Sequence, residues 1–245
     1  MDTQQQKKFK ILVVGDVCKD IYQFGEVSRL SPEAPVPIFK IDNTVTKDGM
    51  AANVVDNLKK LGCDVHGIFG QYSTKTRLID KRSQQQITRI DQDVLSHTAY
   101  IPAFYYDSIV FSDYGKGTVS YELIEDTRRR FSGPIFVDTK KTDLKRFEGC
   151  IVKINELESN HISTECSDLI ITRGRGLVSF RNMLFSVPDT EVVDVCGAGD
   201  TFLSALCFNF LKTSDMKQSI KFAILAASVT VKHRGVYAPS LPEII

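Results

Sequence analysis

The chain has 245 residues, a formal net charge of +1, 42% hydrophobic residues and 25% charged residues. This balance suits one folded domain over residues 1–245, and it excludes a disordered chain and a broad basic surface for nucleic acid. No apolar run is long enough to span a membrane, the start does not resemble a signal peptide, and the six cysteines form no C-x-x-C pair. We therefore expect a cytoplasmic protein with free thiols that binds neither nucleic acid nor a membrane.

The first predicted strand covers residues 9–16 and ends in Gly15-Asp16. Its continuous apolar run is typical of a buried parallel strand. Ligands of open α/β sheets bind at the edge where such strands end, so Asp16 is a candidate to bind substrate hydroxyls. An acid in this position can also be only a turn former.

Two stretches predict a small β-sheet lid. Residues 21–26 and 38–42 alternate in polarity and are separated by a proline-rich segment, which favours short strands. Residues 74–80 and 86–91 alternate in the same way and predict a hairpin. Lid strands over about 20–45 and 74–92 could cover a site. Their exposed edges would be protected by pairing across a homodimer.

A helix is predicted after residue 50, because apolar residues recur at a spacing of three up to Leu61 and Gly62 then supplies a stop. Asn53 lies in its first turn. The amide can bind a sugar hydroxyl, or it can simply satisfy backbone groups of the helix.

The rest of the chain alternates strands and helices. Strands are expected at 108–113, 134–138, 150–154 and 169–172, a hairpin at 177–187, and helices at 199–211 and 216–232. This order predicts an α/β fold with a doubly wound, mostly parallel sheet flanked by helices.

A glycine-rich turn at residues 194–200 precedes the first of those two helices. Backbone N–H groups at Gly197 to Gly199 could hold a phosphate at the helix N-terminus, with Asp200 beside it as a proton acceptor. The same residues also fit a turn in which Asp200 only caps the helix. Polar residues after several strands favour phosphoryl transfer with a divalent metal over a plain binding role.

The segment Asp194-Val195-Cys196-Gly197-Ala198-Gly199-Asp200 resembles the D-T-x-G-A-G-D signature of the PfkB, or ribokinase-like, carbohydrate kinases, with valine in place of the usual threonine. Residues 14–16, 28–37, 112–117 and 138–147 are similar to segments of the D-glycero-β-D-manno-heptose-7-phosphate kinases, and the similarity covers nearly the whole chain. The resemblance implies a ribokinase-like fold, the cofactors ATP and Mg²⁺, and phosphorylation of the anomeric hydroxyl of a heptose 7-phosphate.

The resemblance also implies a role for each matching residue. Asp200 corresponds to the catalytic base, and Gly197, Ala198 and Gly199 correspond to the anion hole for the transferring phosphoryl group. Asn155 and Glu158 match the N-x-x-E element that holds Mg²⁺ through water. The expected sugar contacts are Asp16, Gly49 and Asn53, the ATP contacts are Thr172 and Gly174, and the candidates for the substrate's own phosphate are Lys75, Arg77 and Lys140.

Three features depart from the family pattern. Met50 replaces the second of two paired glycines, Ile224 replaces an asparagine near the adenine site, and little remains of a turn, helix and strand between Gly70 and Thr74. These departures keep a second hypothesis open, namely a catalytically reduced relative that binds a sugar phosphate or a nucleotide, or serves as an assembly partner.

Overall fold

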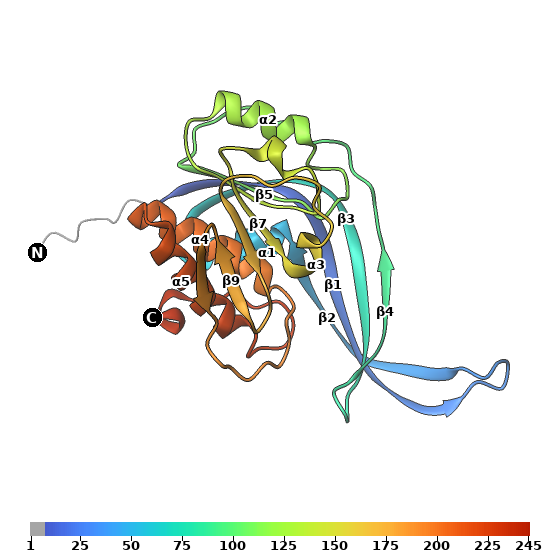
Figure 1. Cartoon of the computed structure of the whole chain (residues 1–245). Coiled ribbons are helices and arrows are strands. Elements are labelled where there is room, and N and C mark those ends of the chain that lie inside the picture. Colours follow the sequence, from blue (N-terminus) through green and yellow to red (C-terminus); the bar gives the residue numbers. More distant parts are fainter. Residues whose placement is uncertain (1–7) are drawn as a thin grey trace, which may run out of the picture.

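The computed structural model describes residues 8–245, and its strands form one ten-stranded sheet in the order β10-β9-β8-β7-β6-β5-β1-β3-β4, with β2 paired to β1 (Figure 1). Pairing is parallel from β3 through β1 and β5 to β8, and antiparallel at both margins. The bounds are β1 Lys10–Leu30, β2 Pro37–Met50, β3 Asp64–Asp80, β4 Gln86–Gln92, β5 Ser108–Ser112, β6 Ile135–Asp138, β7 Ile151–Asn155, β8 Leu169–Thr172, β9 Leu177–Phe180 and β10 Met183–Ser186.

Helices cover both faces of the sheet. Helices α1 (Ala51–Lys60), α4 (Ala198–Thr213) and α5 (Met216–Thr230) bury their apolar residues on one face. Helix α2 (Tyr121–Arg130) and the 3-10 turn Leu144–Phe147 cover the other (Figure 1). Two short helices, α3 (Glu156–Ser159) and α6 (Leu241–Ile244), complete the set. The predicted doubly wound, mostly parallel α/β fold is confirmed.

Strand β1 shows why its sequence is continuously apolar. Ile11 and Val13 pack into the core on the α1 and α4 face, whereas Leu12 and Val14 pack into the core on the α2 face. A strand buried on both faces needs apolar residues at every position. Within residues 8–245, no helix is both long and apolar enough to cross a membrane.

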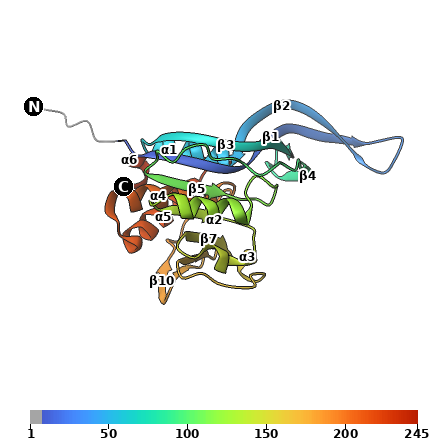
Figure 2. The same ribbon diagram turned by 90° about the horizontal axis from the view of Figure 1, so that it is seen from above.

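The lid is built from longer strands than expected. The short strands predicted near 21–26 and 38–42 belong to the long strands β1 and β2, and residues 64–80 form the single strand β3. The prolines lie at the hairpin tip between β1 and β2, which projects away from the body of the molecule (Figure 2). The prediction of short lid strands was wrong because the segment between Gly70 and Thr74 continues the strand directly from the core into the lid.

The parallel ladder between β1 and β3 runs from the pair Lys10 and Asp64 to the pair Gly25 and Asp80. It has one register shift, between Gly15 and Val17. Asp16 occupies this shift, so the boundary between core and lid coincides with a predicted site residue.

Met50 is strained at the start of α1. Its φ of 59° and ψ of −131° lie in a region that glycine adopts readily and that a side chain makes unfavourable. The side chain is nevertheless buried. The backbone conformation at residue 50 therefore favours the glycine of the family pattern, although this chain has methionine there.

This strain predicts an unusual order of stability at residue 50. We expect Met50→Gly to be more stable than Met50→Ala by about 1–3 kcal/mol, because both lose the buried side chain but only glycine relaxes the backbone. Urea unfolding of the two variants measures the difference. At Ala51, inside the helix, the wild type should instead be more stable than Ala51→Gly by about 1 kcal/mol. Equal stability of the two variants at residue 50 would show that its backbone is not strained.

Candidate active site

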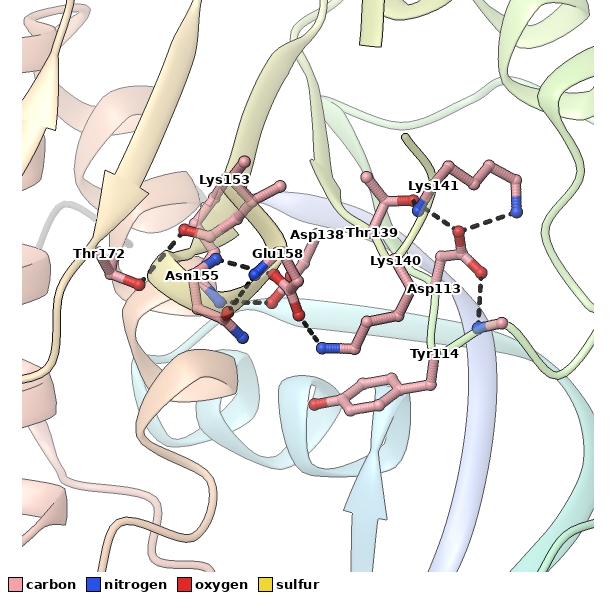
Figure 3. Close-up of polar contacts among 12 residues, drawn as sticks. Asp113, Tyr114, Asp138, Thr139, Lys140, Lys141, Lys153, Asn155, Glu158 and Thr172 are labelled. Atoms are coloured by element: carbon pink, nitrogen blue, oxygen red, sulfur yellow. Dashed lines mark hydrogen bonds and ion pairs between the residues drawn. The ribbon is translucent and has the colours of Figure 1, made fainter. Parts of the chain in front are cut away.

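Polar side chains from neighbouring strands meet at one edge of the sheet (Figure 3). The parallel strands β5 to β8 carry, at or just after their carboxyl ends, the side chains of Asp113, Asp138, Asn155 and Thr172. Ligands of open α/β sheets bind at such an edge. The strand ends therefore bring together polar groups that are distant in sequence.

The glycine-rich turn places the N-terminus of α4 at this edge. Gly197 has a positive φ of 78° and precedes the first helical residue, Ala198. A β-carbon on Gly197 would lie 2.8 Å from Asn53 Nδ2, so both the backbone and the space require glycine. The first N–H groups of a helix have no acceptor within it and attract anions. The assignment of Gly197, Ala198 and Gly199 to an anion hole stays a prediction.

Asp200 lies in the first turn of α4 and is 3% exposed. Asn53 donates to its Oδ2 at 2.9 Å, and the hydroxyl of Tyr114 donates to its Oδ1 at 2.8 Å. Burial raises the pKa of Asp200 to about 6, with a further increase from Asp138, while Asn53, Tyr114 and Lys153 act in the opposite direction. The group suits a general base near neutral pH, because a base works best with a pKa close to the working pH.

A buried ion pair lies beside this carboxylate. Lys153 Nζ is 2.7 Å from Asp138 Oδ2, and both residues are buried. A β-carbon on Gly199 would lie 2.9 Å from the same ammonium group. Lys153 therefore presents positive charge beneath the first turn of α4. The sequence signal for it was a lysine within an otherwise apolar strand, since a buried charge requires a partner.

Asn155 and Glu158 are tied to each other by a capping box. Asn155 Oδ1 accepts from the backbone N–H of Glu158 at 2.9 Å, and Glu158 Oε2 accepts from the backbone N–H of Asn155 at 2.7 Å. The other carboxylate oxygen of Glu158 pairs with Lys140 (Figure 3). The motif that the resemblance assigns to Mg²⁺ thus also begins helix α3.

The assignment of Asn155 and Glu158 to a magnesium ion that keeps its waters stays a prediction. Within the described residues 8–245, no three side chains of His, Cys, Asp or Glu gather as direct metal ligands. Mg²⁺ dehydrates reluctantly and is often held through one or two carboxylates and several waters. Asn155 and Glu158 would hold it in this way.

Asp16 holds a loop rather than standing free. Its Oδ2 accepts from the backbone N–H groups of Tyr114 and Lys116 at 2.7 and 3.0 Å, and its Oδ1 accepts from that of Thr118 at 3.2 Å. Asp16 is 1% exposed. Its predicted contact with a sugar stays a prediction, and a structural role is evident in addition.

The loop contacts predict that Asp16→Asn lowers the free energy of unfolding by about 2–3 kcal/mol without any ligand, since an amide NH₂ would face donors. Urea unfolding measures the loss. Asp64→Asn, an exposed acid at the start of β3, serves as the control and should change stability by less than about 0.5 kcal/mol. An unchanged stability of Asp16→Asn would contradict the structural role.

The three basic candidates for the substrate's phosphate differ in their surroundings. Arg77 donates to Asp20 at 2.5 Å within the buried part of the lid, so a local carboxylate balances its charge. Lys75 and Lys140 instead place their ammonium groups 5.6 and 5.3 Å from the ring centroid of Tyr114. Lys75 and Lys140 therefore meet at one ring. Lys140 also pairs with Glu158, and Arg77 pairs with Asp20.

Gly49 also has a packing reason to be glycine. A β-carbon there would lie 2.2 Å from Asp20 Oδ2 and 2.7 Å from Cys18 Sγ. No side chain fits this space without moving the Asp20 carboxylate that binds Arg77. The predicted contact of Gly49 with a sugar remains a prediction.

A cavity of about 450 Å³ adjoins the N-terminus of α4. Thr172 and Gly174, the two residues that the resemblance assigns to ATP, both line it. Its other walls are mostly apolar and come from β9, α4, α5 and the segment after β10, including Val178, Val187, Ala198, Gly199, Phe202 and Ile224. The size, the apolar walls and the helix N-terminus fit a nucleotide, with its phosphates toward Gly199.

A larger and more open hollow of about 740 Å³ lies at the opposite edge of the sheet, around Lys10, Tyr106 and Asp107. None of the predicted site residues lines it. The predicted site residues Thr172, Gly174, Ala198 and Gly199 line the smaller cavity at the carboxyl edge instead.

Solved structures share the fold of this chain. The ribokinase of Thermotoga maritima superposes with a TM-score of 0.72 at 16% identity, over 96% of this chain and 98% of that chain. The ribokinase of Arabidopsis thaliana, solved with ribose and ATP, gives 0.72 at 14% identity over 97% and 98%. The fold is ribokinase-like.

Sequence comparison identifies the family. Residues 158–244 match the pfkB family carbohydrate kinase model. The chain is 30% identical to the bifunctional protein HldE of Nitratiruptor sp. and to that of Hydrogenovibrio crunogenus, with 97% and 100% of this chain aligned. The chain therefore carries a carbohydrate kinase domain of the PfkB family.

The chain spans about 64% of the length of these two relatives. The first alignment runs over 298 positions, which exceeds the 245 residues of this chain. The relative therefore has residues within the aligned region that this chain lacks, in keeping with the direct passage of β3 from core to lid.

Proposed function

We propose that this chain is an ATP- and Mg²⁺-dependent sugar kinase that phosphorylates the anomeric hydroxyl of D-glycero-D-manno-heptose 7-phosphate. One observation carries the proposal: Asp200, with its pKa raised to about 6, lies in the first turn of α4 beside a cavity that fits a nucleotide. The similarity to HldE proteins supports heptose phosphate as the substrate. Residues 1–245 would act as one kinase domain with its lid.

In the proposed reaction, the acceptor oxygen forms a bond to the γ-phosphorus and the bond to the β–γ bridging oxygen breaks. The proton of the acceptor hydroxyl passes to Asp200. N–H groups of the Gly197 to Gly199 turn would donate to the phosphoryl oxygens, and such preorganised donors are worth most where charge develops. Bound Mg²⁺ would neutralise charge on the β- and γ-phosphates.

The proposed substrate site combines the lid and the sheet edge. Asp16, Gly49 and Asn53 would contact the sugar, and Lys75 with Lys140 would attract a phosphate group. Arg77 would add positive charge to the phosphate site while it remains in its buried ion pair with Asp20. The six free cysteines fit the reducing cytoplasm, where we expect the reaction to occur.

A direct assay tests the proposal. The purified chain is incubated with ATP, Mg²⁺ and a panel of sugars and sugar phosphates, and ADP release and the position of the new phosphate are measured. We expect turnover to be highest with the heptose 7-phosphate. Turnover with another sugar would revise the substrate, and turnover retained by Asp200→Asn would overturn the mechanism.

A second candidate is a catalytically reduced relative that binds a sugar phosphate or nucleotide, or an assembly partner. Two observations favour it: both oxygens of Asp200 already accept hydrogen bonds, and Met50 is strained next to α1. Calorimetry with ATP and with sugar phosphates distinguishes the two candidates. Binding without turnover would support the reduced relative, and efficient turnover would exclude it.

We also propose a homodimer formed through the lid. Apolar residues on its strands are exposed, among them Leu30, Ile41 and Ile90. Exposed strand edges and apolar surface favour pairing with a second copy. Light scattering of the wild type and of Ile41→Lys, which places a charge on the lid, tests this proposal. We expect a dimer that the variant weakens. A monomeric wild type would contradict the proposal.

A further inference from the structure

Tyr114 donates to the Asp200 carboxylate and was not predicted from the sequence as a site residue. It follows β5 and donates its hydroxyl to Asp200 Oδ1 at 2.8 Å, while Asn53 holds Oδ2. Burial and the Asp200 charge raise the pKa of Tyr114 well above its usual value, so the phenol keeps its proton and stays a donor.

The loop that carries Tyr114 is fixed from two sides. Asp16 accepts from the backbone N–H of Tyr114, and Asp113 accepts from the backbone N–H of Gly115 at 3.0 Å. The other oxygen of Asp113 binds Thr139 at 2.6 Å and Lys141 at 2.9 Å (Figure 3). Gly115 takes a positive φ of 73°, which lets the chain turn at this point. Two buried carboxylates, those of Asp16 and Asp113, therefore fix the position of Tyr114.

The ring of Tyr114 also lies between two cations. Lys75 reaches it from lid strand β3, and Lys140 reaches it from the segment after β6. Figure 3 shows the ring beside the Lys140 side chain. A cation near an aromatic ring is attracted to the ring. One side chain thus connects the lid, the sheet edge and the buried carboxylate.

We propose that Tyr114 is a positioning residue for the catalytic base, whose hydroxyl holds the Asp200 carboxylate ionised and oriented so that a free lone pair meets the acceptor hydroxyl. This inference rests on the proposed kinase function. A carboxylate buried like Asp200 needs hydrogen-bond donors to remain charged, and each donor favours the charged form. Tyr114 and Asn53 are the two side chains that donate to it in the described residues.

Other charges near Asp200 act in both directions. Asp138 favours its protonated form, whereas Lys153 favours its ionised form. Lys140 and Cys18 interact with it electrostatically as well. Tyr114→Phe removes one donor and leaves all of these groups, together with the aromatic ring between Lys75 and Lys140.

The test compares the pH dependence of kcat/KM for wild type and Tyr114→Phe. We expect the acidic limb of the profile to move to higher pH by about one to two units, since a hydrogen bond to a charged group contributes roughly that much. Activity should fall about ten- to hundredfold below this limb and change less above it. Tyr106→Phe removes a hydroxyl that contacts His66 at the opposite edge, and it should leave the profile unchanged.

A second readout does not depend on turnover. In ¹³C NMR of the ligand-free protein, the Asp200 carboxyl is identified by its absence in Asp200→Asn, and its titration midpoint should rise in Tyr114→Phe. An unchanged midpoint and profile in Tyr114→Phe would overturn the role of Tyr114. Turnover retained by Asp200→Asn would instead overturn the proposed mechanism, so the two failures are distinguishable.

Discussion

Replacing Asp200 with asparagine is expected to lower kcat by about 10²–10⁴-fold, because an amide cannot accept the proton of the acceptor hydroxyl. The wild type should lose activity as the pH falls through about 6, where Asp200 becomes protonated. Initial rates at saturating ATP and sugar phosphate measure the loss of kcat, and the pH profile of kcat/KM, which reports the free enzyme, measures the acidic limb. An acidic limb near pH 4 would show that burial does not perturb this carboxylate.

The same variant should reveal the energetic cost of the buried charge. The pKa of Asp200 is raised from 3.8 to about 6 in the folded state, so the folded state binds the proton more tightly than the unfolded state does. Stability from this group is present at low pH and is lost as the pH rises between these values, by up to about 3 kcal/mol. The stability of Asp200→Asn relative to wild type should therefore improve between about pH 4 and pH 7.

Urea unfolding at the two pH values measures this change. Any mismatch between the new amide and Asn53 lowers the free energy of unfolding equally at both pH values. The change in stability with pH therefore reports only the effect of the Asp200 charge. A relative stability that stays constant, or that worsens as the pH rises, would contradict the raised pKa.

Lys153→Met is expected to destabilise the fold by about 3–5 kcal/mol, because it leaves the buried Asp138 carboxylate without its partner. The double variant Lys153→Met with Asp138→Asn should recover a large part of this loss, since it removes the unpaired charge. Urea unfolding of both single variants and the double variant forms a cycle that isolates the pair.

Lys19→Met is the matched control for this cycle. Lys19 pairs with Asp48 at 2.5 Å, but both side chains are about two-fifths exposed, and such pairs contribute about 1 kcal/mol or less. If Lys153→Met lowered the free energy of unfolding as little as Lys19→Met, the ion pair of Lys153 with Asp138 would not be an essential buried contact. Strictly additive effects in the cycle would lead to the same conclusion.

Much of the fold could be predicted from the sequence because its signals are local. The apolar run of β1, the glycine stop after α1 and the order of strands and helices define a doubly wound sheet. The continuous lid could not be predicted from alternation alone. Whether two apolar stretches form one strand or two depends on the parallel pairing of β1 with β3, which is a contact between distant segments.

The site, like the fold, could be predicted only in part. Asp200 and Gly197 stand in a recognisable motif, and the structure brings Asn53 against both. Tyr114 was missed because its importance comes from a partner on another element, which local sequence does not reveal. Lys153 stood out as a charge within an apolar strand, but its partner Asp138 lies on another strand. Asp16 was predicted at the correct edge, but its contacts with the loop after β5 follow only from the folded backbone.

The β1–β3 ladder continues from the core into the lid, and this continuity has a mechanical consequence. A lid joined to its core by flexible loops can rotate freely, but here any tilt has to bend hydrogen-bonded strands. Bending concentrates where pairing is irregular, and the one register shift in this ladder is at Asp16. Asp16 also holds the backbone of Tyr114, so a displacement of the lid tip would be transmitted to the tyrosine that contacts Asp200.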